Sequence, residues 1–148
     1  MFRQTTASRT ARPIDPLAEN EYERGIDYGN FGANLLFLER TGLLSRGHRI
    51  LEIGSGHGRM LHHLFSNGFD VRGVEVSAGV IATGKRVYGD LPYTLATGAD
   101  LPFDDNAFDV VLSFDVFEHI PDSDGHLREA ARVLKPRGHY LLQTPNKW

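Results

Sequence analysis

The sequence predicts an α/β fold in which one doubly wound, mostly parallel sheet lies between two layers of helices. From residue 48 onward, apolar segments of strand length alternate with segments of helical periodicity. Such alternation is typical of parallel strands joined by right-handed crossovers. A glycine-rich turn directly after the first strand is a second indication, because sheets of this class bind ligands at the carboxyl ends of their strands. With 148 residues, 41% of them hydrophobic, the chain suffices for one domain with a core.

The elements follow in a regular order along the chain. Residues 1–16 are rich in Thr, Arg and Pro, which predicts a flexible arm before a folded domain of residues 17–148. A helical pattern covers 16–44, and its apolar stripe consists of Phe31, Leu35, Leu36, Leu38 and Leu43. A strand ending at Ile53 comes next. After it we expect helices at 57–67, 77–88 and 123–134 and strands at 70–75, 93–97, 108–113 and 138–144.

Composition argues against several classes of function. The net charge of −3 and the pI near 6.1 disfavour a nucleic-acid surface, which needs Lys and Arg clustered on one face. No apolar run approaches the roughly 20 residues of a membrane span, and the N-terminus has no apolar signal core. The absence of cysteine excludes disulfides and thiolate zinc sites and is compatible with a reducing compartment. We therefore expect a cytoplasmic protein.

The glycine-rich turn is the most informative stretch. Glycines alternate at positions 54, 56 and 58, and an acidic residue, Glu52, stands two positions before them. The glycines permit a tight turn and close approach of the backbone, and the amides at the start of the next helix point toward a ligand. In the dinucleotide-binding pattern the third glycine falls one position later, where this chain has Arg59. A carboxylate beside the turn also repels phosphate, so a cationic amino-acid ligand suits it better.

Two further acidic residues follow apolar segments. Glu75 ends the second strand, 21 residues after Gly54, where such folds place the acid that accepts hydrogen bonds from ribose hydroxyls. Alternatively, Glu75 is a solvated strand end or a cap for the helix that begins near Ser77. Asp100 precedes a polar turn before the strand at 108–113. From its residue type alone, Asp100 is equally a turn residue bonded to its own backbone.

The combined motifs resemble those of the class I methyltransferases that use S-adenosylmethionine. Residues 52–58 read E-x-G-x-G-x-G, like the family's first motif, and residues 99–113 are similar to its third and fourth motifs. Residues 113–121 and the Arg-Val-Leu-Lys-Pro-Arg-Gly run at 132–138 match the family as well, except that Arg137 stands where glycine is usual. The resemblance covers residues 50–146 and is closest to the small-molecule branch that includes the ubiquinone-biosynthesis methyltransferases.

This resemblance implies a Rossmann-like fold, S-adenosylmethionine as cofactor and a small-molecule methyl acceptor. Asp100 then bonds the adenine amine while its apolar neighbours hold the ring. Tyr22 or Tyr28 of the N-terminal helices closes over the cofactor, or else both tyrosines are ordinary half-buried packing residues. The residues expected to bind the cofactor are Glu52, Gly54, Ser55, Gly56, Gly58, Glu75, Val76, Asp100, Leu101, Phe114 and Tyr28.

The implied reaction is an in-line displacement at the sulfonium methyl. The sulfonium charge already activates that methyl, so the protein mainly positions and desolvates the reactants. His119, just after the fourth strand, is the candidate general base for an acceptor that must lose a proton. Asp115, Glu118 and His119 have the spacing of the metal ligands of the ubiquinone-pathway enzymes, with Asp115 replacing their glutamate. The helix dipole is an alternative reason for acids at a helix start, and we expect no metal.

Five strands are expected here, whereas a complete class I domain has seven. The sequence therefore predicts a truncated chain or gene fragment that lacks strands six and seven. Residues 139–144 would then form an apolar edge strand that is unpaired or covered by self-association. One alternative to a methyltransferase is a noncatalytic module that binds S-adenosylmethionine. Another is a nucleotide-dependent oxidoreductase, which Glu52 and Arg59 disfavour.

Overall fold

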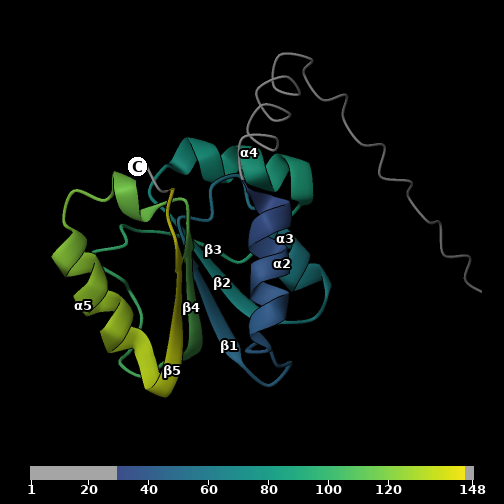
Figure 1. The fold of residues 1–148 in the computed structure, drawn as a ribbon. Helices are drawn as coiled ribbons and strands as arrows, with labels where there is room; N and C mark the ends of the chain where they lie inside the picture. Colours follow the sequence, from purple (N-terminus) through teal and green to yellow (C-terminus); the bar gives the residue numbers. More distant parts are fainter. Residues whose placement is uncertain (1–29, 146–148) are drawn as a thin grey trace, which may run out of the picture.

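A computed structural model describes residues 30–145 and contains one five-stranded sheet (Figure 1). The strands are β1 (Arg49–Ile53), β2 (Asp70–Glu75), β3 (Tyr93–Leu95), β4 (Phe108–Phe114) and β5 (Leu134–Gln143). They lie in the order β3-β2-β1-β4-β5, and every neighbouring pair is parallel. The chain runs outward from β1 to β3, then returns past β1 to β4, so the strand order reverses between β1 and β4. Sheets of this class bind ligands at such a reversal.

Helices cover both faces of the sheet, as the sequence predicts. Helices α2 (Phe31–Thr41) and α3 (Arg59–Ser66) lie on one side of the sheet in Figure 1, and α5 (Ser123–Val133) lies on the other. Helix α4 (Ala78–Tyr88) joins β2 to β3, and a short 3-10 helix, η1 (Phe117–His119), follows β4. This arrangement confirms the three-layer α/β fold.

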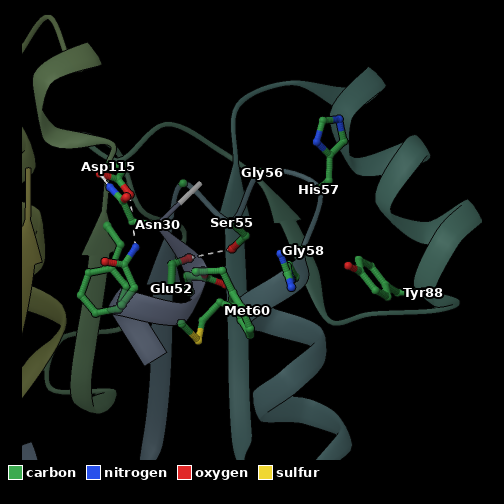
Figure 2. A pocket seen from close by; sticks show the side chains of 14 residues that line it. Asn30, Glu52, Ser55, Gly56, His57, Gly58, Met60, Tyr88 and Asp115 are labelled. Atoms are coloured by element: carbon green, nitrogen blue, oxygen red, sulfur yellow. Dashed lines mark hydrogen bonds between the residues drawn. The ribbon is translucent and has the colours of Figure 1, made fainter. Parts of the chain in front are cut away.

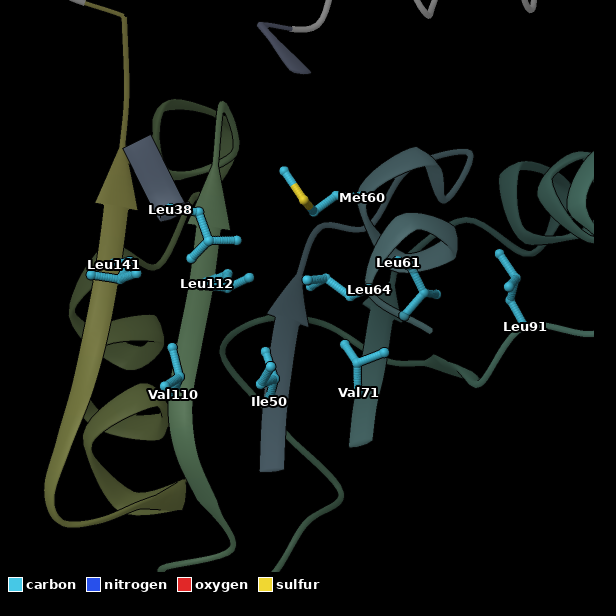
Figure 3. Close-up of a cluster of buried hydrophobic side chains, with 10 residues drawn as sticks. All are labelled: Leu38, Ile50, Met60, Leu61, Leu64, Val71, Leu91, Val110, Leu112 and Leu141. Carbon is cyan, nitrogen blue, oxygen red and sulfur yellow. The ribbon is translucent and has the colours of Figure 1, made fainter. Parts of the chain in front are cut away.

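Two hydrophobic clusters hold the layers together. The cluster under α2 and α3 (Figure 3) consists of Leu38, Ile50, Met60, Leu61, Leu64, Val71, Leu91, Val110, Leu112 and Leu141. The cluster under α5 consists of Leu51, Ile53, Val74, Leu101, Phe108, Val111, Ala130 and Val133. Consecutive residues of β1, such as Ile50 and Leu51, belong to opposite clusters because side chains of a strand alternate between its two faces.

Several elements begin at residues other than those the sequence suggests. The helix expected at 57–67 begins at Arg59 because Gly58 has φ 88°, which no helical residue can have. Helix α4 begins after Ser77, whose hydroxyl accepts a hydrogen bond from the Val80 amide at 3.3 Å. Strand β5 begins at Leu134 rather than 138, because Leu134 pairs with Phe108 before an irregularity in the register. Arg137 lies in that irregularity with φ 64°.

The N-terminal region is described only in part. Within the described residues, the helical pattern expected at 16–44 becomes the single helix α2, which ends at Gly42 in a left-handed conformation. Leu38 is fully buried there, but Leu36, expected in the apolar stripe, is 46% exposed. The expected arm at 1–16, Tyr22 and Tyr28 all lie outside the described residues. In residues 30–145, no helix is long and apolar enough to cross a membrane.

Candidate functional site

Two adjoining cavities open at the carboxyl ends of β1, β2 and β4. The smaller cavity, about 210 Å³, is lined by the glycine-rich turn, Glu52, the start of α2, Phe114 at the end of β4, and Asp115 directly after it. The larger cavity, about 560 Å³, is lined by Glu75 and Val76, by residues 96–99, and by residues 115–122 in part. Gly54 and Asp115 line both cavities. A ligand that fills both would pass between these two residues.

The glycine-rich turn has the conformation that its sequence suggests. The amides of Gly54 and Ser55 donate to the Val74 carbonyl at 2.8 and 2.9 Å, which ties the turn to β2. Gly54, Gly56 and Gly58 all have positive φ, a region that favours glycine. A Cβ atom at Gly54 would collide with Val116, and one at Gly58 with Tyr93, whereas one at Gly56 would meet nothing within 4 Å. Gly56 therefore leaves open space beside the smaller cavity.

Glu52 is the most unusual ionisable group of this site. Its side chain lies between the two ends of the smaller cavity, with Asp115 and Asn30 at one end and His57 and Tyr88 at the other (Figure 2). Glu52 is only 6% exposed, and its Oε2 atom has no hydrogen-bond partner. The pKa of Glu52 is raised to about 8, mainly by burial and to a smaller extent by the nearby charge of Glu75, while the Ser55 hydroxyl opposes the shift.

Glu75 lies in the wall of the larger cavity, where the sequence places a ribose-binding acid. Its Oε2 atom accepts a hydrogen bond from the Gly56 amide at 3.0 Å, and Oε1 accepts one from the Ser77 amide at 3.0 Å. Glu75 thus joins the glycine-rich turn to the start of α4, so its expected alternative role at a helix start is also present. Val76, 67% exposed, lies beside it in the same wall.

Asp100 and Leu101, both expected to contact adenine, lie outside the walls of the two cavities. Asp100 is exposed, and Leu101 is buried in the cluster under α5. The Leu101 amide donates to Glu129 at 2.8 Å, and its carbonyl accepts from Arg132 at 2.9 Å. These bonds to α5 draw Leu101 into the core. Residues 96–99, rather than Asp100 and Leu101, line the larger cavity.

His126 is a buried residue that the sequence analysis did not single out. It is fully buried on α5; Nδ1 lies 3.2 Å from the Gly98 carbonyl, and Nε2 lies 2.6 Å from the Tyr140 hydroxyl. Because a carbonyl only accepts hydrogen bonds, we assign the proton to Nδ1 and let the hydroxyl donate to Nε2. Burial lowers the pKa of His126, which favours this neutral form. Since Gly98 lines the larger cavity, His126 supports that wall from behind.

Asp115, Glu118 and His119 do not converge on one point. The Asp115 carboxylate accepts hydrogen bonds from the side-chain amides of Asn30 at 3.4 Å and Asn34 at 3.2 Å. Glu118 accepts from the Thr144 hydroxyl at 2.9 Å. The His119 side chain is 78% exposed and lines the larger cavity. Among residues 30–145 there is no group of three His, Cys, Asp or Glu residues that could hold a metal ion.

Comparison with known proteins identifies the family. A family model described as a methyltransferase domain matches residues 51–142. The chain belongs to this methyltransferase family. The match covers β2, β3 and β4, most of β1 and β5, and the glycine-rich turn.

Relatives of this methyltransferase domain include named N-methyltransferases and O-methyltransferases. Phosphoethanolamine N-methyltransferase 2 of Caenorhabditis elegans is 28% identical in an alignment of 136 positions that covers 86% of this chain and 31% of that protein. The ubiquinone biosynthesis O-methyltransferase of Alkalilimnicola ehrlichii is 28% identical in an alignment of 106 positions that covers 68% of this chain and 43% of that protein. The chain thus spans less than half the length of these two curated relatives.

A solved structure supports the same fold. The Haemonchus contortus phosphoethanolamine N-methyltransferase 2, solved with phosphomonomethylethanolamine and S-adenosylhomocysteine, has a TM-score of 0.66 and 32% identity. The match covers 74% of this chain and 27% of that one. The family resemblance and the fold expected from the sequence are therefore both confirmed.

The methyltransferase domain also has wall residues that the sequence analysis overlooked. Asn34 lines the smaller cavity and is 6% exposed, although it lies on α2 among apolar residues. The sequence contained a signal for this position. Asn34 lies three residues after Phe31 and four before Leu38, a spacing that places its polar side chain inside the apolar stripe. Phe114, which was expected, lines the same cavity and packs edge-on against Phe37.

Proposed function

We propose that this methyltransferase domain binds S-adenosylmethionine across the two cavities and transfers its methyl group to a small molecule. The observation that carries the proposal is Glu52, a carboxylate that is 6% exposed, has an oxygen without a partner and borders the glycine-rich turn. A buried carboxylate is costly unless something pairs with it. A ligand with an ammonium group at the glycine-rich turn would supply that partner.

The residues present fit this cofactor. The larger cavity is bordered by the exposed Val76 and by Glu75 at the end of β2, a pairing that suits a nucleoside with ribose hydroxyls. The smaller cavity has Glu52 and the open space beside Gly56, which suit an amino-acid moiety. Asp100 as a partner of the adenine amine remains a prediction from the family resemblance, as does Tyr28 as part of a cover.

S-adenosylmethionine supplies a methyl group that is already activated by positive sulfur. The chain's part is to orient the reactants and to keep water away from them. Phe114 and Val116 place apolar surface beside the junction of the cavities, one in each wall. The His119 ring borders the larger cavity and solvent, so it can accept a proton from an acceptor hydroxyl or amine and release it to water.

Two finer expectations belong to the same proposal. The acceptor is a small molecule, which the names of the phosphoethanolamine and ubiquinone relatives support.

Self-association through residues 139–144 is supported by the position of β5 at the edge of the sheet and by Leu142, which is 37% exposed. Analytical ultracentrifugation of the unmodified chain and of Leu142→Lys tests self-association, because the charge would keep two edges apart.

A thermal unfolding experiment tests the cofactor. The unmodified chain is heated with S-adenosylmethionine, S-adenosylhomocysteine, a nicotinamide dinucleotide or buffer alone. A ligand at about 100 times its Kd adds about 2.7 kcal/mol, which raises the midpoint by roughly 5 to 10 °C for a domain of this size. We expect a shift only with the two adenosyl sulfur ligands. A shift only with the dinucleotide would favour an oxidoreductase, and the absence of any shift would contradict the proposal.

A separate assay tests transfer. The chain is incubated with S-adenosylmethionine that carries a labelled methyl group and with candidate small amines and phenols. Label in an acceptor supports the enzyme. Binding without transfer to any acceptor would favour the noncatalytic module instead.

A further inference from the structure

Asp115 lies at the junction of the two cavities. It follows β4 directly, and of the described residues only it and Gly54 line both cavities. Its backbone has φ 58°, in the left-handed region that few non-glycine residues adopt. That conformation turns the chain from β4 toward η1. The carboxylate therefore sits where a ligand would pass from one cavity to the other.

Neutral amides hold the Asp115 carboxylate in place. The Nδ2 atoms of Asn30 and Asn34 donate to it from the start of α2. With its amide oriented so that nitrogen faces Asp115, Gln143 donates to the two carboxylate oxygens at 2.7 and 3.2 Å. Amides orient a carboxylate without neutralising its charge. The amides thus fix the direction of the Asp115 carboxyl group at the junction.

A second acidic side chain faces the same space. Glu52 ends with an unpartnered oxygen beside the smaller cavity, and β1, which carries it, pairs with β4. Figure 2 shows Glu52 between Asp115 and the glycine-rich turn. The Asp115 carboxylate and the unpartnered oxygen of Glu52 both favour a ligand with positive charge, because a cation attracts the first and offers the second a partner.

We propose that Asp115 recognises the positive sulfur of the cofactor and makes the site discriminate between S-adenosylmethionine and S-adenosylhomocysteine. This inference rests on the proposed function. The sulfur joins the nucleoside to the amino-acid part, so a ligand that spans both cavities brings its sulfur to the junction. In the transfer, an acceptor lone pair forms the new bond to the methyl carbon, and the electron pair of the carbon–sulfur bond returns to sulfur. The sulfur is then neutral, Asp115 no longer attracts it, and release of the product is favoured.

Calorimetric titration of the full chain with each of the two ligands tests this inference. The variant is Asp115→Asn, which removes the charge and keeps a residue that tolerates the left-handed backbone. The unmodified chain should bind S-adenosylmethionine more tightly than S-adenosylhomocysteine. In Asp115→Asn, the affinity for S-adenosylmethionine should fall about tenfold, while that for S-adenosylhomocysteine should change less than about twofold. Asp115→Gly is the second variant, because glycine adopts this backbone without strain, and it should give the same change in the ratio.

Asp104→Asn is the matched control. It removes one negative charge from an exposed turn that borders neither cavity, so the ratio of the two affinities should stay that of the unmodified chain. If both Asp115 variants lost the same affinity for the two ligands, or lost none, the role assigned to Asp115 would be wrong. The proposal that the chain binds S-adenosylmethionine would still stand. Failure of the unmodified chain to bind either ligand would overturn the proposed function and this inference together.

Discussion

Polar groups on the two sides of the sheet differ in their hydrogen-bond partners: those of α5 are partly buried and fully paired, whereas the buried Glu52 has an oxygen without a partner. On the α5 side, the Arg132 guanidinium donates to Glu129 at 2.7 Å, to the Leu101 carbonyl at 2.9 Å and to the Phe103 carbonyl at 2.8 Å. At the glycine-rich turn, Glu52 Oε2 has no partner. Ser113 Oγ is the other such atom among the described residues, but a neutral hydroxyl costs far less to bury than a carboxylate.

The pKa values of two glutamates express this difference. The hydrogen bond from Arg132 is the main reason that the pKa of Glu129 falls to about 2. Burial raises the pKa of Glu52 to about 8. The comparison teaches that polar groups which serve the fold come with their partners in the same chain. A group that serves a ligand is held at a cost to stability until the ligand arrives.

Removing the Arg132 guanidinium, which is the partner of Glu129, should have the largest effect on stability. In Arg132→Met, the Leu101 and Phe103 carbonyls lose a donor and Glu129 loses its cation, so the free energy of unfolding should fall by about 3 kcal/mol. Urea denaturation measures it. Arg132→Lys keeps the charge but not the planar fork of donors. Its free energy of unfolding should therefore lie between those of the unmodified chain and of Arg132→Met. A loss under about 0.5 kcal/mol in Arg132→Met would contradict the comparison.

Neutralising Glu52 should raise the free energy of unfolding, whereas Arg132→Met lowers it. Between the ordinary pKa of 4.5 and about 8, the folded chain holds a proton on Glu52 that the unfolded chain has released. Stability therefore falls as pH rises through this window and levels off above it. Glu52→Gln should abolish this loss and gain about 2 kcal/mol at pH 7. Urea denaturation at pH 5 and pH 8 checks the slope.

Glu39→Gln is the control for that experiment. Glu39 is an exposed residue of α2, so its variant should keep the pH dependence of the unmodified chain. If Glu52→Gln kept that dependence as well, the burial argument for Glu52 would be wrong.

Replacing His126, a third polar residue that is paired within the fold, should lower the free energy of unfolding by less than Arg132→Met does. His126→Phe fills the same space but leaves the Gly98 carbonyl and the Tyr140 hydroxyl without their partner, so the free energy of unfolding should fall by about 1–2 kcal/mol. His126→Asn restores a donor near the position of Nδ1 and should recover part of the loss. Thermal unfolding ranks the two variants. Equal stability of both would show that the bond to Gly98 contributes nothing.

Much of the fold could be predicted because its signals are local. Strand β2 occupies the expected residues 70–75, and the alternating glycines marked the turn after β1. The irregular start of β5 could not be predicted, because Leu134 pairs with Phe108 across a distance of 26 residues. Glu52 was predictable from its place before the glycines. The three amides around Asp115 were not, since α2, β4 and β5 bring Asn34, Asp115 and Gln143 together only in the folded chain.

The central claim is that Glu52 stays without a partner until a cationic ligand reaches the glycine-rich turn. Titration calorimetry with S-adenosylmethionine at pH 7, in two buffers of different ionisation enthalpy, tests this most directly. The raised pKa of Glu52 leaves it mostly protonated at pH 7, and a cation beside it lowers that pKa. We expect binding with release of a proton in the unmodified chain, and much less release in Glu52→Gln. Binding with no proton release in the unmodified chain, or equal release in both proteins, would contradict the claim.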